Sequence, residues 1–126
     1  MFANVGLVKT YIAGGAIAEH RIVQYGESDR EVTKASAGTQ KFAGVIGLPK
    51  GASAVLGDAV DVIKSGIAEV VYGGTVTAGD ALTADSQGRA VVASDGNSII
   101  GYAYTAGASG ELGAVQIQFG KHYIKA

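Results

Sequence analysis

Two histidines limit the acid–base chemistry that this chain could carry out. His20 lies between Glu19 and Arg21 at the start of an expected strand, and His122 lies close to the last residue. A Ser-His-Asp arrangement needs a histidine hydrogen-bonded to a nucleophile and oriented by a third group. The sequence contains no G-x-S-x-G motif that would mark such a nucleophile. We therefore interpret both histidines as surface residues.

Paired carboxylates are a second possible source of chemistry. Asp58 with Asp61, and Glu27, Asp29 and Glu31 together, are spaced closely enough to divide the roles of acid and base. Hairpin tips and edge strands also carry charge for solubility and to prevent edge pairing, and this structural interpretation is favoured. A hydrolase using these carboxylates stays the third alternative for function, which a pH-dependent activity lost in Asp58→Asn would support.

Cofactor and metal motifs are missing from the sequence. The glycine-rich stretches at 13–15, 73–74 and 106–113 lack the Lys-Ser/Thr ending of a phosphate loop. Neither the Asp80 to Asp85 segment nor Asp95-Gly96-Asn97 has the ligand spacing of a calcium loop. The chain has no cysteine, which excludes disulfides and thiolate zinc sites. We expect no catalytic residues, no metal, no cofactor and no small-molecule substrate.

The charges and aromatic residues restrict the classes of partner. Ten basic residues, scattered from Lys9 to Lys125, face 11 acidic ones, which argues against nucleic acid and an anionic membrane as partners. No stretch approaches the roughly 20 apolar residues of a membrane helix. Tyr102 and Tyr104 point to one side of an expected strand, where they would form either a sugar-binding platform or part of a core or subunit interface.

The apolar residues are of the kind that favours strands. The sequence has 14 Val, 10 Ile and 7 Thr against 5 Leu and 1 Met, and β-branched side chains fit a pleated sheet better than a helix. Runs of this type alternate with turn residues, as in Ile22–Tyr25 before 26–29, and in 81–84 and 89–92 around Asp85-Ser86-Gln87-Gly88. Short strands with frequent turns predict an all-β sandwich or barrel, and the length fits one domain.

Residues 1–19 contain apolar side chains but no helical face, since Gly6, Gly14 and Gly15 interrupt the segment. We predict an extended N-terminal arm over 1–19, followed by a single β domain over 20–126. A signal peptide is the competing interpretation, but Lys9 is the only early cation and paired glycines break the apolar stretch after it.

An internal similarity indicates a duplicated β unit. GASAVLG at 51–57 matches GASGELG at 107–113 at five of seven positions, and Arg30 and Arg89, like Gly44 and Gly101, occupy comparable places before them. The predicted units cover about 20–65 and 79–120. Chance similarity between Gly/Ala-rich segments is the alternative, because two repeats are a thin basis.

A long ordered series of short motifs resembles one family. It runs from Arg21-Ile22-Val23 through SGIAEV at 65–70, GDALTADSQGRA at 79–90 and IIGYA at 99–103 to Val115, about four fifths of the chain. This series is similar to the capsid cement, or head decoration, proteins of tailed phages, relatives of the lambda-type decoration protein.

The resemblance implies a small β-barrel or β-clip (β-tulip-like) domain that forms a homotrimer. It implies binding to the outer surface of the mature virion capsid, where the protein, made in the host cytoplasm, bridges subunits of the major capsid protein and stabilises them. It brings no catalytic residues. For capsid contact we expect the apolar arm residues Phe2, Val5, Leu7 and Tyr11, because an extended segment can add to a neighbour's sheet edge. A strand completing its own domain is the alternative for the arm, and a virion-surface or tail-associated carbohydrate-binding module using Tyr102 and Tyr104 is the alternative for function.

Overall fold

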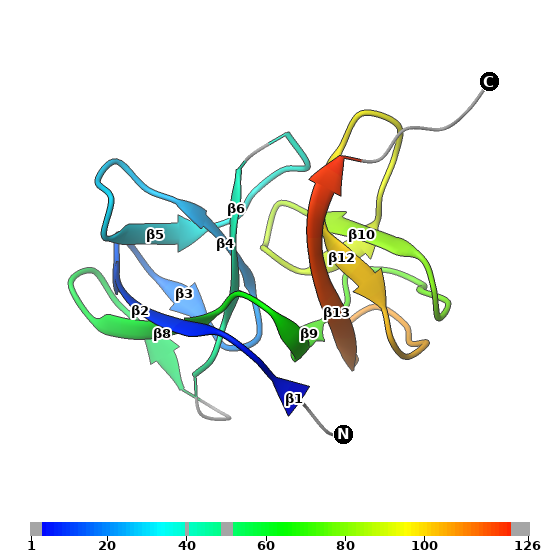
Figure 1. Cartoon of the computed structure of the whole chain (residues 1–126), viewed down its shortest axis with the longest axis horizontal. Helices are drawn as coiled ribbons and strands as arrows, with labels where there is room; N and C mark the ends of the chain where they lie inside the picture. Colours follow the sequence, from blue (N-terminus) through cyan, green and yellow to red (C-terminus); the bar gives the residue numbers. More distant parts are fainter. Residues whose placement is uncertain (1–3, 40, 49–51, 122–126) are drawn as a thin grey trace.

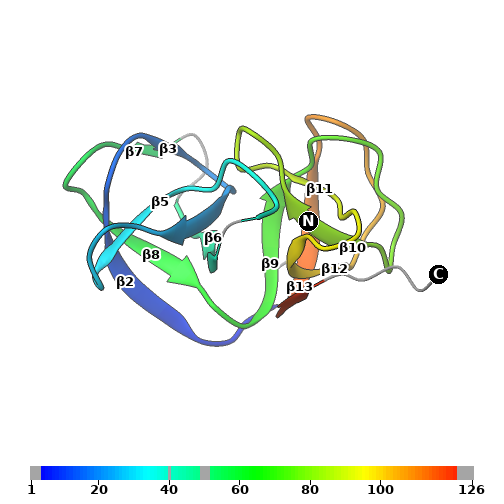
Figure 2. The same cartoon turned by 90° about the horizontal axis from the view of Figure 1, so that it is seen from above.

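The computed structural model describes residues 4–39, 41–48 and 52–121. These residues form 13 β-strands and no helix, which confirms the predicted all-β class. The strands build two lobes that lie side by side (Figures 1 and 2). The first lobe contains the strands between residues 8 and 63, and the second contains the strands from residue 66 onward. The first strand of the chain is the exception, since it joins the second lobe.

The first lobe is a closed five-stranded barrel with a small added sheet, which confirms the predicted barrel. Its barrel order is β2-β5-β4-β6-β8, with β2 and β5 parallel and the other pairs antiparallel. Strands β3 and β7 pair with each other beside it. The strands are β2 (Val8–Ala13), β3 (Ile17–Ala18), β4 (Ile22–Tyr25), β5 (Glu31–Lys34), β6 (Phe42–Ile46), β7 (Ser53–Ala54) and β8 (Ala59–Ile63).

The second lobe is a curled six-stranded sheet of order β1-β9-β13-β12-β10-β11. The end of β9 returns to β11 through a parallel bridge between Tyr72 and Ala90, so the sheet almost closes on itself. Its strands are β1 (Asn4–Val5), β9 (Gly66–Val71), β10 (Ala81–Ala84), β11 (Ala90–Val92), β12 (Ser98–Ala103) and β13 (Leu112–Lys121).

Strand pairing in the second lobe repeats that of the first. Strands β9, β10, β11, β12 and β13 pair among themselves as β2, β4, β5, β6 and β8 do, including the single parallel contact. Val23 lies opposite Gly44 as Leu82 lies opposite Gly101, and Ile22 lies opposite Val45 as Ala81 lies opposite Tyr102. Gly44 and Gly101 therefore occupy equivalent positions. The structural repeat spans 8–63 and 66–121 and so begins earlier in each half than the boundaries proposed from the sequence.

The most similar sequence segments are nevertheless out of register with this repeat. The turn before β8 is closed by Asp58, whose carboxylate accepts from Val55 N, and the turn before β13 is closed by Glu111 accepting from Ala108 N. Residues 55–58 thus correspond to 108–111, three positions away from the match between 51–57 and 107–113.

The predicted N-terminal arm is extended, and its strands pair within the same chain. Strand β1 pairs with β9 of the second lobe, and β2 pairs with β8 and β5 of the first. Between them Gly6 N donates to Ser65 O (2.9 Å), Leu7 N to Ser65 Oγ (2.7 Å), and Lys64 N to Leu7 O (2.8 Å). The segment thus forms a continuous ladder with the link between the lobes, which matches the alternative in which it completes its own domain.

Two apolar cores hold the lobes. The interior of the first barrel contains Val23, Val32, Ile46 and Val62, all with no exposed surface. The interior of the second lobe is completed by residues of the first, since side chains on the outside of β4 and β6 belong to the same cluster as Val70, Leu82 and Ile100. Strand β6 is consequently buried at every residue, with one face in each core.

Candidate functional site

The four predicted arm residues have different surroundings. Phe2 lies outside the described residues, and Val5 lies in β1 opposite Gly66. Leu7 is 52% exposed in the connection between β1 and β2, whereas Tyr11 is half-buried against the first core. Of the two arm residues whose side chains are described, Leu7 is therefore more available for an apolar contact than Tyr11.

Tyr11 takes part in a cluster around Lys64 that the sequence did not indicate. Lys64 Nζ donates to the hydroxyls of Tyr11 (3.0 Å) and Tyr25 (3.1 Å) and to Ala43 O (3.0 Å). The amine also lies 5.0 Å from the centroid of each ring, a distance at which cation–π attraction operates. Burial lowers the pKa of Lys64. The hydrogen bonds and charge interactions with the two tyrosines together raise the pKa by more than burial lowers it, so the pKa lies above the ordinary lysine value. The cluster ties the link between the lobes to one end of the first barrel.

Replacing Lys64 with methionine is expected to lower the free energy of unfolding by about 1 kcal/mol at pH 7, because three acceptors lose a charged donor at a partly solvated site. Since the folded-state pKa is raised, this contribution is complete below the unfolded pKa of lysine and is lost as the pH rises through the folded value. Urea denaturation at pH 7 and at about pH 11 should show the difference between wild type and variant shrinking. Lys9→Met, on an exposed position of β2, is the control, and an unchanged difference at the higher pH would contradict this account.

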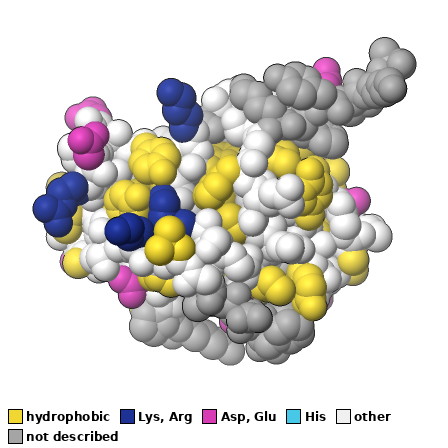
Figure 3. Space-filling view, viewed as in Figure 1, with side chains coloured by type: hydrophobic (Ala, Val, Ile, Leu, Met, Phe, Trp, Pro, Cys, Tyr) yellow, Lys and Arg dark blue, Asp and Glu magenta, His cyan; other side chains and the backbone are white. Residues whose placement is uncertain are grey.

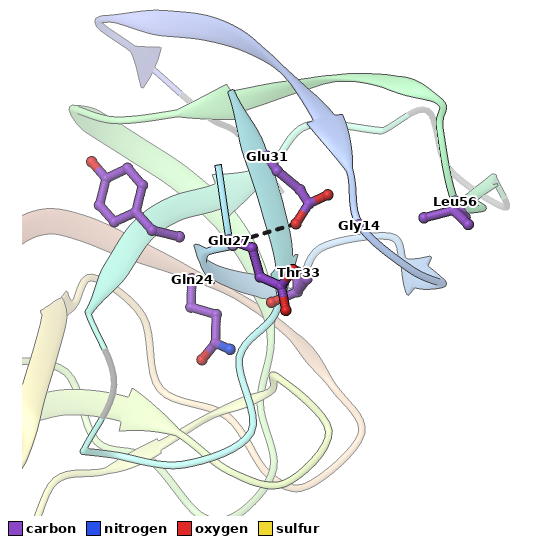
Figure 4. A pocket seen from close by; sticks show the side chains of 8 residues that line it. Gly14, Gln24, Glu27, Glu31, Thr33 and Leu56 are labelled. Atoms are coloured by element: carbon purple, nitrogen blue, oxygen red, sulfur yellow. Dashed lines mark hydrogen bonds between the residues drawn. The ribbon is translucent and has the colours of Figure 1, made fainter. Parts of the chain in front are cut away.

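An open groove runs along the first barrel beside this cluster. One part, of about 620 Å³, is lined by Gly14, Gln24, Glu27, Glu31 and neighbouring residues; a second part, of about 410 Å³, adds Thr39 and Lys41, and both share Gln24, Tyr25 and Gly26. Figure 4 shows Glu31 turned toward Glu27, whose backbone N donates to Glu31 Oε1 (3.1 Å).

Small residues make room for Glu31 in this groove. A Cβ added at Gly14 or Gly26 would lie 2.7 and 2.6 Å from atoms of the Glu31 side chain. Gln24 Oε1 is buried and has no hydrogen-bond partner among the described residues. The groove therefore contains a carboxylate held in place by the backbone, and a buried amide oxygen without a hydrogen-bond partner among the described residues.

Tyr102 lies in β12, and Tyr104 lies just beyond the end of that strand at Ala103. They are 37% and 46% exposed, and Tyr102 lies opposite Gln116 of β13 and Ala81 of β10. The two tyrosines belong to the second lobe, whereas the groove is lined by residues of the first lobe.

Three of the carboxylates considered for acid–base chemistry accept hydrogen bonds from neighbouring parts of the fold. Asp58 closes the turn before β8, Asp61 Oδ1 accepts from Thr10 Oγ1 (2.9 Å), and Glu31 holds the turn at Glu27. Asp85 accepts from Gln87 N and Arg89 N and pairs with Arg89 Nε at 2.9 Å. Within residues 4–39, 41–48 and 52–121, no three His, Cys, Asp or Glu residues are grouped as a metal site would require.

His20 has a structural role in the contact between the lobes. It is the one non-glycine residue with positive φ (56°) among those described, its carbonyl accepts from Val71 N (2.9 Å), and its ring lies 3.8 Å from Glu19. His122 lies outside the described residues.

Exposed apolar side chains occur on both lobes. Figure 3 shows them in separate groups, with the lysine and arginine side chains of this face gathered over the first lobe. Among the large apolar residues, the largest exposed fractions are those of Leu56 (73%) and Val55 (60%), in the turn before β8. The sequence did not indicate this surface, because Val and Leu also suit a strand. The described part of the chain contains no helix, and therefore no helix that could span a membrane.

Comparison with known proteins shows similarity at the level of the fold. No family model matches the chain, and no curated protein matches it. Among solved structures, the chain is similar to the N base of the head fiber gp8.5 of bacteriophage phi29, with 23% identity and a TM-score of 0.68. The match covers 94% of this chain and 98% of the phage structure, so the whole two-lobed arrangement is shared.

Proposed function

We propose that this chain is a non-enzymatic structural protein of a tailed-phage head, which binds the outer surface of the mature capsid and stabilises it by bridging major capsid protein subunits. The observation that carries the proposal is the match over nearly the whole length of both chains to the base of a phage head fiber. The motif series resembling the capsid cement family supports it independently. The proposed assembly is a homotrimer located on the virion.

The proposed mechanism needs a preformed shape rather than reactive groups. Two lobes joined by a continuous ladder present a rigid surface to a repeating lattice, and each site bound adds free energy to the capsid state that binds. At 100 times its dissociation constant a ligand adds about 2.7 kcal/mol to that state. The free energies from many such sites on one shell add together. A small domain could therefore stabilise a virion by binding alone.

Leu7 is the proposed capsid contact within the arm, since its side chain is 52% exposed and its segment is held by Ser65. Removing residues 1–12 would delete most of β2 and open the barrel, so a point variant is the cleaner test. Leu7→Asp is expected to weaken co-sedimentation with mature capsids of the encoding phage at least about tenfold, as for a central apolar contact. Leu112→Asp, at a 37% exposed position of β13, is the control and should bind as wild type.

Two results would count against the proposal in different ways. If folded Leu7→Asp binds capsids as wild type does, the arm is not the contact. If the wild-type protein ignores mature capsids, the capsid-binding function is wrong.

A carbohydrate-binding module on the virion surface or tail is the second candidate, because Tyr102, in β12, and Tyr104, just after it, are 37% and 46% exposed. Glycan-array binding that is abolished by Tyr104→Ala, without capsid affinity, would favour it.

A further inference from the structure

The first lobe packs on the second through one apolar face. The second lobe carries a face built from the equivalent strands, and part of that face is exposed. In the first lobe this face consists of side chains on the outside of β4 and β6 and the residue after β5. Ile22, Ala35 and Val45 have no exposed surface and Phe42 retains 7%, all within the core of the second lobe.

Backbone hydrogen bonds fix that contact at three places. Ile22 N donates to Gly88 O (2.7 Å), Val71 N to His20 O (2.9 Å) and Ser98 N to Gly38 O (2.7 Å). The second lobe thus receives the first at the turn before β11, the end of β9 and the start of β12.

The structural repeat assigns a counterpart to each residue of this face. Ala81 and Tyr102 lie opposite each other as Ile22 and Val45 do, and Ala93 N donates to Ala81 O as Ala35 N donates to Ile22 O. Ile99 precedes Gly101 as Phe42 precedes Gly44. Ala81, Ala93 and Ile99 form an apolar cluster of their own and are already buried within the single chain, so this part of the counterpart face is covered.

We call this counterpart the β10–β12 face, and its outer part is open. Tyr102 is 37% exposed, whereas its equivalent Val45 is completely buried. Val92 lies opposite the interior residue Leu82, as Lys34 lies opposite Val23, so it borders this face at the end of β11 and does not lie on it; it is 47% exposed. In the first lobe the Lys34 side chain lies close to Gly88 of the neighbouring lobe.

We propose that the β10–β12 face docks onto the first lobe of a second copy of this chain, repeating between molecules the packing seen between the lobes. The receiving surface follows from the same correspondence. Tyr25 lies opposite Val32 as Ala84 lies opposite Ala90, and Lys41 precedes β6 as Ser98 begins β12. The part of the groove of about 410 Å³ is lined by Tyr25, Thr39 and Lys41 at this place.

Exposed residues must make the contact between copies. Tyr102 on the β10–β12 face and Val92 at its rim are exposed, whereas Ala81 is already buried within the chain. Lys41 at the receiving surface also complements the tyrosine ring of the incoming face, since a cation over such a ring is attracted.

One difference makes the contact between copies weaker than the contact within the chain. Ile12 and Arg30 of the first lobe are equivalent to Val71 and Gly88 of the second, whose backbone groups bind the first lobe. Ile12 N instead donates to Arg30 O (2.7 Å), so neither group is free to bind a second copy. Side chains must then supply the affinity. The contact joins two different surfaces, so repetition closes a ring or extends a filament instead of forming a two-fold dimer.

This inference rests on the self-assembly in the proposed function but not on capsid binding. It is tested without capsids, so its failure and that of capsid binding are distinguishable.

The first test is sedimentation velocity of the full chain over a wide concentration range. Wild type is expected to associate reversibly, and Tyr102→Asp and Val92→Asp are each expected to raise the dissociation constant at least about tenfold. Val55→Asp, at a 60% exposed position of the first lobe outside both surfaces, is the matched control and should associate as wild type. A wild type that stays monomeric at every concentration, or variants that associate unchanged, would overturn the proposal.

The second test uses the absence of native cysteine. Tyr102→Cys and Lys41→Cys proteins, each carrying one thiol, are mixed and mildly oxidised. Cross-links between the two different variants are expected to exceed those within either variant alone. Preferential linking of Tyr102→Cys to itself would establish a two-fold contact and refute the head-to-tail arrangement.

Discussion

Val45→Asp is expected to destabilise the fold by at least about 4 kcal/mol, while Tyr102→Asp at the equivalent position of the second lobe should change the stability of the monomer by less than about 1 kcal/mol. Val45 is completely buried in the core shared by the lobes, so an aspartate there would be an unpaired buried charge. Tyr102 is 37% exposed, so a carboxylate there can be hydrated. Chemical denaturation at low protein concentration, where self-association is absent, measures both values.

Each of these two variants is the control for the other, because the two positions lie on corresponding strands opposite corresponding residues. Similar losses in the two variants would show that the repeated topology does not place the two side chains in different environments. Val45→Ala separates burial of charge from loss of volume, and its expected cost is smaller, about 2 kcal/mol.

Gly101→Ala is expected to lower stability by about 3 kcal/mol. A Cβ at this position would overlap the backbone O of Gln116 on the neighbouring strand, and backbone of a central strand cannot move aside as a flexible side chain can. Gly44→Ala meets the carbonyl of Ile63 in the same way, and its φ of 154° adds to the cost. Thermal unfolding followed by circular dichroism gives the two shifts.

Gly15→Ala is the control for these glycines, since nothing lies within 4 Å of the added atom and its φ is not in the left-handed region. Its expected effect is within about 0.5 kcal/mol of zero. A Gly101→Ala protein as stable as wild type would mean that β12 and β13 can separate without cost at that point.

The sequence predicted the strands better than their partners. The β-branched runs with turn residues between them correspond to β4, β5, β10 and β11, whose hairpins are local. Strand β1 pairs with β9, about 60 residues away, and no local pattern distinguishes a free extended arm from a strand whose partner is so distant. The predicted arm was therefore extended, but its place in the sheets came only from the structure.

The candidate surfaces were predicted in part for a related reason. Tyr102 and Tyr104 were proposed because alternation along one expected strand would place them on one face, but β12 ends at Ala103, before Tyr104. Lys64 could not be found, since its three acceptors come from β2, β4 and β6 and meet only in the closed barrel. Val45 and Tyr102 are both apolar residues of apolar strands, and only the packing of the lobes shows that one is covered and the other is not.

The shared core has a consequence for how this molecule unfolds. Because the interior of the second lobe is lined in part by side chains of the first, the second half has no complete interior alone, and the first half alone would expose Ile22, Phe42 and Val45 to solvent. Denaturant should therefore melt the two halves in one two-state transition, with coincident signals from probes placed in each. A gene cut at the link between the halves should yield fragments that are stable only when mixed.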